Sequence, residues 1–168
     1  GILPRRQQLP PHAICDVADL RRAAEENELQ IVAVSYCWLT PDHPDPEGEQ
    51  LQTLGPVIEH FPLKEHLVFF IDWCSLYQEP KSVVQHRSAQ RALRKIHYWY
   101  AHHQVATWML TDVPASAARN LAYERRGWPS FEFRVSMMLK RQGALLNLGV
   151  LEDDMFDADF FHPQKGIM

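Results

Sequence analysis

The sequence has few glycines, seven among 168 residues. Phosphate-binding loops depend on closely spaced glycines, because the backbone amides must approach the phosphate without an intervening side chain. Residues 47–56 contain only Gly48 and Gly55, and no Lys-Ser or Lys-Thr pair follows them. The sequence therefore lacks a P-loop, and the shortage of glycine disfavours a dinucleotide dehydrogenase.

Cysteine is also scarce, with Cys15, Cys37 and Cys74 widely spaced and odd in number. Such a set implies no disulfide framework. No Cys-x-x-Cys or His-Glu-x-x-His pattern occurs, and the adjacent His102 and His103 would point apart, so we expect no metal site. Cys74 follows a predicted strand and could be a nucleophile with a histidine as its base, but a buried, inert thiol is the simpler interpretation.

Long apolar runs and an excess of positive charge are both missing. The longest strongly apolar stretch, Leu67 to Ile71, is far shorter than the roughly 20 residues that a bilayer requires, and no secretory signal is visible. The formal charge of -4 and the pI near 6.1 give no electrostatic footprint for DNA or RNA. We expect a cytoplasmic protein without nucleic-acid or membrane partners.

The chain has the length and composition of one compact domain. Residues 1–12 contain Pro4, Pro10 and Pro11 among polar residues and predict an arm or linker. The remainder, 13–168, predicts a single α/β domain, which could belong to a longer parent protein with other domains.

Four segments have the apolar, β-branched character of buried strands. They are Gln30 to Trp38, Leu67 to Asp72, Gln104 to Leu110 and Ala144 to Val150. Helical periodicity falls between them. The expected helices run from Asp16 to about Asn27, over Leu51 to Phe61 with a kink or break at Gly55-Pro56, over Ala89 to Trp99, and from Gly127 or Trp128 to about Lys140.

Strands alternating with helices predict a three-layer, flavodoxin-like α/β fold, with a mostly parallel central sheet of four to five strands flanked by helices. In such sheets, ligands bind beyond the carboxyl ends of the strands. The residues that directly follow the strands therefore matter most. These are Ser35 to Trp38, Asp72 to Gln78, and Thr111 to Asp112.

Glu132 is placed unusually within the last predicted helix. Its spacing puts it on the same face as a set of apolar residues: Trp128, Phe131, Val135, Met138 and Leu139. An unpaired buried carboxylate costs several kcal/mol, or its pKa moves, so such an acid needs a partner or a task. Apolar surroundings would raise its pKa and a helix N-terminus would lower it. A structural ion pair remains the alternative, with Arg125, Arg126 or Arg134 as partner.

Aromatic residues gather at the same predicted sheet edge. Trp73 directly follows Asp72 in the sequence, and Tyr36 and Trp38 lie at the end of another predicted strand. Such rings can stack on a base or a nicotinamide, although each could also be an ordinary core residue. Together with Asp72 and Glu132 they predict a ligand pocket.

Three segments in order resemble the HET (heterokaryon incompatibility) domains. Ser35-Tyr36-Cys37-Trp38 resembles their S-Y-x-W opening, residues 71–78 (IDWCSLYQ) resemble their W-I-D-x-x-C-I-x-Q segment, and residues 126–132 (RGWPSFE) resemble their R-x-W-x-x-Q-E segment. HET domains are related to TIR (Toll/interleukin-1 receptor) domains, whose enzymatic members carry a catalytic glutamate four residues after a tryptophan. Trp128 and Glu132 match that spacing, whereas Phe131 departs from the HET pattern, so the chain looks like a divergent TIR-like branch.

This resemblance implies a TIR-like domain that hydrolyses the nicotinamide–ribose bond of NAD, with Glu132 as the catalytic residue. NAD would be a substrate, with no tightly bound cofactor and no metal. Arg126 could contact a phosphate or pair with Glu124. The resemblance implies nucleotide-binding roles for Ser35, Tyr36, Trp38, Asp72, Trp73, Gln78, Arg126 and Trp128.

The rival hypothesis is a TIR-like or HET-like signalling module that self-associates without catalysis. The loop 39–48 and the helix 87–100 would then supply contacts, and Glu132 would be a structural acid. For the enzyme, the resemblance implies activation by self-assembly in a defence or cell-death pathway. A nucleoside deoxyribosyltransferase-like activity is a more distant alternative, because that family also uses a carboxylate on a related fold.

Overall fold

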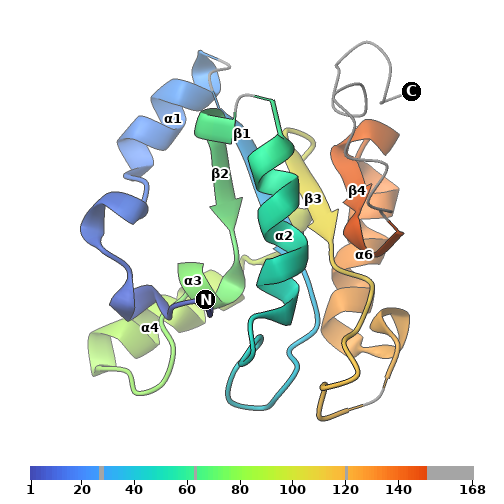
Figure 1. The fold of residues 1–168 in the computed structure, drawn as a ribbon. Helices are drawn as coiled ribbons and strands as arrows, with labels where there is room; N and C mark the ends of the chain where they lie inside the picture. The colour runs from blue at the N-terminus through green and yellow to red at the C-terminus, as the bar shows by residue number, and fades with distance from the viewer. Residues whose placement is uncertain (27–28, 63, 120, 151–168) are drawn as a thin grey trace.

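A computed structural model describes residues 1–26, 29–62, 64–119 and 121–150. Its centre is a parallel sheet in the order β2-β1-β3-β4 (Figure 1). The strands are β1 (Gln30–Ser35), β2 (Leu67–Phe70), β3 (Val105–Met109) and β4 (Leu145–Asn147). This order is the flavodoxin-like one, and the predicted α/β class is confirmed. The part of the predicted domain after residue 150 lies outside the described residues.

Short helices and single turns connect the strands. The α-helices are α1 (Val17–Glu25), α2 (Glu49–His60), α3 (Asp72–Ser75), α4 (Val83–Leu93), α5 (His97–Ala101) and α6 (Gly127–Leu139). The 3₁₀ turns are η1 (Arg6–Gln8), η2 (Pro11–Ala13), η3 (Lys64–His66), η4 (Tyr123–Arg125), η5 (Gln142–Ala144) and η6 (Leu148–Val150).

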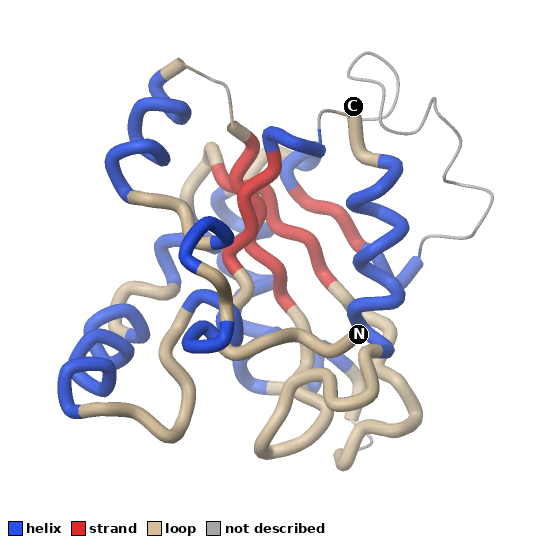
Figure 2. The backbone as a smooth tube through the Cα atoms, turned by 60° about the vertical axis from the view of Figure 1, so that its left-hand side comes forward, coloured by secondary structure: helices blue, strands red, loops and turns tan. Residues whose placement is uncertain are grey.

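Helices cover both faces of the sheet and give the fold its three layers. On one face α2 crosses in front of the strands, and its Leu54 and Val57 pack against Val32 and Trp108 (Figure 1). On the other face, residues of α5 and α6 join a second core around Ala33. Loops gather at the end of the sheet where the strands finish (Figure 2).

Two predicted helices differ in detail from the observed ones. α2 continues through Pro56, which lacks the amide for one helical hydrogen bond, so the expected break at Gly55-Pro56 is absent. The single helix expected over 89–99 is wrong, because α4 ends at Leu93 and α5 begins at His97. The amide of Lys95 bonds to the carbonyl of Ala92 at 2.9 Å, a tighter three-residue turn that separates the two helices.

The strands are shorter than the apolar runs that predicted them. β1 ends at Ser35, which pairs with Met109 of β3, and the chain leaves the ladder at Tyr36. β2 ends at Phe70, and Asp72 is the first residue of α3 rather than the end of a strand. An apolar run therefore overestimates the length of a strand when the residues after the strand are buried without belonging to it.

The N-terminal residues lie along α3 and the loop that follows it. The Leu3 carbonyl accepts a hydrogen bond from Trp73 Nε1 at 3.0 Å, and Arg6 Nη1 donates to the Ser75 carbonyl at 3.0 Å. The Gln7 amide group donates to the carbonyl of Gln78 at 2.5 Å. The segment predicted as an arm thus bonds to the loop next to Asp72.

Candidate active site

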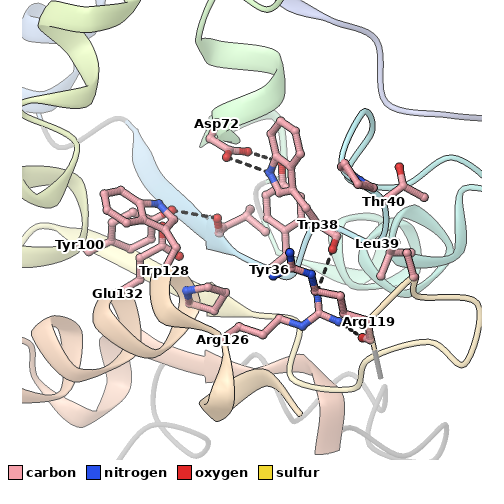
Figure 3. A pocket seen from close by; sticks show the side chains of 14 residues that line it. Tyr36, Trp38, Leu39, Thr40, Asp72, Tyr100, Arg119, Arg126, Trp128 and Glu132 are labelled. Carbon is pink, nitrogen blue, oxygen red and sulfur yellow. Dashed lines mark hydrogen bonds between the residues drawn. The ribbon is translucent and has the colours of Figure 1, made fainter. Parts of the chain in front are cut away.

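A cavity of about 620 Å³ opens at the carboxyl end of β1 (Figure 3). The strand order switches between β1 and β3, because β2 is added on one side of β1 and β3 on the other. Ligands bind at such a switch point in open α/β sheets. Glu132 and Tyr100 lie on one side of this cavity, and Arg119 and Arg126 lie toward another, near Leu39. Its lining residues are Val34, Tyr36, Trp38, Leu39, Thr40, Pro41, Asp72, Tyr100, Ala118, Arg119, Arg126, Trp128, Pro129 and Glu132.

Glu132 lies on the inner face of α6, with 3% of its surface exposed. Ser35 Oγ donates a hydrogen bond to Glu132 Oε2 at 2.5 Å. Ser35 Oγ also lies 2.5 Å from the Tyr123 hydroxyl. A serine hydroxyl has only one hydrogen, so Tyr123 donates to Ser35 and Ser35 donates to Glu132. The three side chains form a buried chain of hydrogen bonds that ends on the carboxyl group.

Burial raises the pKa of Glu132 to about 8, and the charge of Asp72 adds to the rise. Hydrogen bonds from Ser35 and Tyr100 act in the opposite direction, because they stabilise the ionised form. Glu132 is the sixth residue of α6, beyond the first turn in which the helix dipole is strong. Of the two opposing influences expected from the sequence, burial therefore wins.

Asp72 is the second acid of the cavity. Its carboxylate accepts hydrogen bonds from the Tyr36 hydroxyl, from Trp38 Nε1 at 3.1 Å and from the amide of Trp73 at 2.6 Å. Burial raises its pKa, and the bonds from Tyr36 and Trp38 lower it. Asp72 thus fixes the orientation of two aromatic rings that line the cavity.

Three of the predicted nucleotide-binding residues do not line the cavity. Trp73 points toward the N-terminal segment, to which its Nε1 donates a hydrogen bond. Its ring also meets the ring of Trp38 edge-on, with 5.4 Å between the ring centroids. Gln78 donates to the carbonyls of Leu76 at 3.0 Å and Asp72 at 3.3 Å, and so holds the loop after α3. Ser35 lies behind Glu132, in contact with its carboxyl group.

Arg126 lines the cavity, but its guanidinium donates hydrogen bonds to backbone carbonyls. Its guanidinium donates to the carbonyls of Trp38 at 2.9 Å, Arg119 at 2.5 Å and Leu121 at 3.1 Å. Within the part of the chain that the structure describes, it has no ion pair, so the expected pair with Glu124 is not formed. Arg126 joins two loops of the cavity wall and leaves its positive charge without a neighbouring carboxylate.

The apolar face of α6 is more exposed than the sequence predicts. Glu132 is buried as expected, but Trp128 is 47% exposed, Phe131 41% and Met138 81%. The buried residues of the helix are Pro129, Glu132 and Ser136. Of the apolar residues expected on the buried face, Val135 packs against the core around Ala33, Trp128 lines the cavity, and Phe131, Met138 and Leu139 are exposed. Trp128 and Phe131 stack at 5.7 Å beside the cavity.

Sequence reasoning missed three residues of the site. Tyr100 is buried in α5, one turn after the buried Ile96, a spacing that could have identified it. Tyr123 lies in a 3₁₀ turn without any periodic signal. Arg119 is an exposed loop residue that only the three-dimensional arrangement brings to the cavity.

Among residues 1–26, 29–62, 64–119 and 121–150, no group of three His, Cys, Asp or Glu side chains is arranged to hold a metal ion. No helix in the same ranges is long and apolar enough to cross a membrane. Protein-family models, curated proteins and solved structures were compared with the chain, and none matches.

Proposed function

We propose that this cavity binds NAD and that the protein hydrolyses the bond between nicotinamide and ribose, with Glu132 as the catalytic carboxyl group. The observation that carries the proposal is the position of Glu132: it is almost fully buried, yet it lines an open cavity with aromatic walls. Perturbed carboxyl groups in such cavities are typical of catalytic sites. The segment 128–132 resembles the corresponding segment of enzymatic TIR domains, and this resemblance supports the same role for Glu132.

The reaction develops positive charge on the ribose ring as the glycosidic bond breaks. An ionised Glu132 beneath the ribose stabilises that charge, and the hydrogen bond from Ser35 favours the ionised form. Trp38 and Trp128 supply surfaces for the two ring systems. The positive charges of Arg119 and Arg126 suit the diphosphate.

The test is the release of nicotinamide from NAD by the purified protein, with products identified by mass. Glu132→Gln keeps the shape of the side chain and removes its charge, so we expect at least about a 100-fold loss of turnover. Glu124→Gln is the matched control, because Glu124 is exposed and outside the cavity lining. Since the ionised acid acts, kcat/KM of the natural chain should rise as the pH increases through about 8. Equal turnover in the two variants would refute the catalytic role.

The exposed apolar face of α6 favours a second function, self-association of a signalling module. Met138 and Leu139 are 81% and 56% exposed on this helix, and exposed apolar patches mark interaction sites. The expected result is a molar mass that rises with protein concentration in light scattering. Met138→Glu should abolish that rise without altering the fold, and a chain that stays monomeric at high concentration would contradict this function.

A further inference from the structure

Two further cavities share no lining residue with the candidate active site. One, of about 540 Å³, lies at the amino ends of β1 and β3, where Gln30 and Val105 line it. The other, of about 560 Å³, lies between β2 and the N-terminal segment that leads to α1. Figure 1 shows α1 beside the edge of the sheet rather than on a face. Leu20, Ile31 and Trp99 line both cavities, so the two adjoin at these residues.

The second cavity follows the free edge of β2. It is lined by every residue from 67 to 71, and successive side chains of a strand point to opposite faces of a sheet. A cavity in contact with both sets must run along the edge of the strand. The opposite wall comes from residues of the N-terminal segment and α1: Arg6, Leu9, Ala13, Ile14, Cys15, Val17 and Leu20.

The walls of the two adjoining cavities are mostly apolar. Among the residues that the structure describes, no Asp or Glu lines either cavity, and Arg6 and Arg21 supply positive charge. At the far end, Arg6 donates to the Ser75 carbonyl at 3.0 Å and lies 4.9 Å from the Tyr77 ring centroid, so its charge is already engaged. At the mouth, Arg21 is exposed and makes no hydrogen bond or ion pair with the part of the chain that is described. The space is therefore apolar along its length and cationic at one opening.

A second donor stands at the same opening. His102 Nδ1 accepts a hydrogen bond from the Gln104 amide at 3.2 Å, so the neutral ring carries its proton on Nε2. His102 and Gln104 both line the cavity with Arg21. A carboxylate at this mouth meets the guanidinium of Arg21 and further hydrogen-bond donors, whereas a cation is repelled by the charge of Arg21.

We propose that the joined cavities bind a long-chain aliphatic carboxylate, with its head group at Arg21 and its chain running past Leu20, Ile31 and Trp99 along the edge of β2. The volumes fall in the range of small-molecule sites, and apolar cavities take apolar ligands in preference to water. This site does not depend on the proposed cleavage of NAD.

Binding of dodecanoate, measured by calorimetry and by displacement of a fluorescent fatty acid, tests the proposal. Arg21→Glu should weaken dodecanoate at least about tenfold, because it places like charge at the mouth. Arg22→Glu is the matched control, because Arg22 pairs with Asp19 at 2.8 Å and lines neither cavity. Both residues are exposed, and circular dichroism verifies that each variant folds.

Ligand chemistry provides the second arm of the experiment. From octanoate to dodecanoate, affinity should rise by up to about fourfold per added methylene. Dodecanol should bind the natural chain more weakly than dodecanoate does. Arg21→Glu should leave the affinity for dodecanol unchanged. Leu20→Trp, which fills the junction, should block dodecanoate while Met138→Glu on α6 leaves it unchanged. Equal binding of dodecyltrimethylammonium, equal effects of the two arginine variants, or no binding would each overturn the proposal.

Discussion

Two buried ionisable side chains, one within α6 and one directly after its end, differ in what surrounds them. Glu132 contacts Ser35 and lines the candidate active site. Two turns later, Lys140 Nζ donates to Thr107 Oγ1 at 2.6 Å and to the Trp99 carbonyl at 3.2 Å. Burial raises the pKa of Glu132 to about 8 and lowers the pKa of Lys140 to about 8.

Burial therefore displaces both pKa values strongly and in opposite directions, but only Glu132 lines the cavity and can meet a ligand. Lys140 lies in a closed network in which Thr107 contacts Ser136 at 3.1 Å and Ser136 donates to the Tyr100 carbonyl at 3.0 Å. In both groups burial is the largest cause of the pKa shift, so the shift alone does not identify a catalytic group. Access to the cavity is what distinguishes a candidate catalytic group from a structural one.

The pH dependence of stability gives the largest expected difference between the natural chain and Glu132→Gln. The folded protein keeps the Glu132 proton up to about pH 8, whereas the unfolded chain loses it near its ordinary pKa of 4.5. The contribution to stability is complete below pH 4.5 and is lost as the pH rises through 8, by at most about 5 kcal/mol. Lys140 acts with the opposite sign, and only between about pH 8 and 10.5.

Urea unfolding at several pH values from 5 to 9 measures this effect. The free energy of unfolding of the natural chain should fall with pH more steeply than that of Glu132→Gln, because the variant has no proton to release. Asp72 is common to both proteins and cancels in the difference. Parallel curves would show that Glu132 titrates normally in the folded protein.

A matched pair of serine substitutions should separate the two networks. Ser35→Ala and Ser136→Ala each remove a buried hydroxyl with two partners, so each should cost about 1 to 3 kcal/mol of stability. Only Ser35→Ala removes a bond that lowers the pKa of Glu132, so only this variant should move the midpoint of carboxyl titration upward. Carbon NMR of labelled glutamate measures that midpoint; a shift in Ser136→Ala would break the distinction.

Lys140→Met should have the smallest effect on chemistry. The side chain lies outside the cavity lining, so nicotinamide release should stay within about twofold of the natural rate. The variant should also lose the gain in stability between about pH 8 and 10.5. A large loss of turnover in a folded Lys140→Met protein would show that the closed network also serves the site.

The sequence predicts the sheet well because buried parallel strands are continuous apolar runs. The start of α6 follows from Gly127 and Pro129. Glu132 is buried as expected, but Trp128 and Phe131, the apolar residues whose spacing predicted its burial, are exposed. Periodicity places these apolar residues together without identifying which face of the helix packs against the sheet.

The site itself could be predicted only in part. Tyr36, Trp38 and Asp72 were found because they follow strands, and parallel strands bring their ends together. The same rule selected Trp73 and Gln78, which the N-terminal segment and the α3 loop engage instead. Tyr123 reaches Ser35 from a turn 88 positions away in sequence, a contact that no local pattern encodes.

The strand order also constrains how the chain can fold. β1 pairs with β2 and β3, and both partners come later in the sequence, beginning at Leu67 and Val105. Long loops must close before these pairings contribute, which slows folding in chains of high contact order. The cavity draws residues from Val34 to Glu132, so no shorter folding unit contains it. The cavity therefore forms only when β1 and α6, which lie far apart in the sequence, have come together.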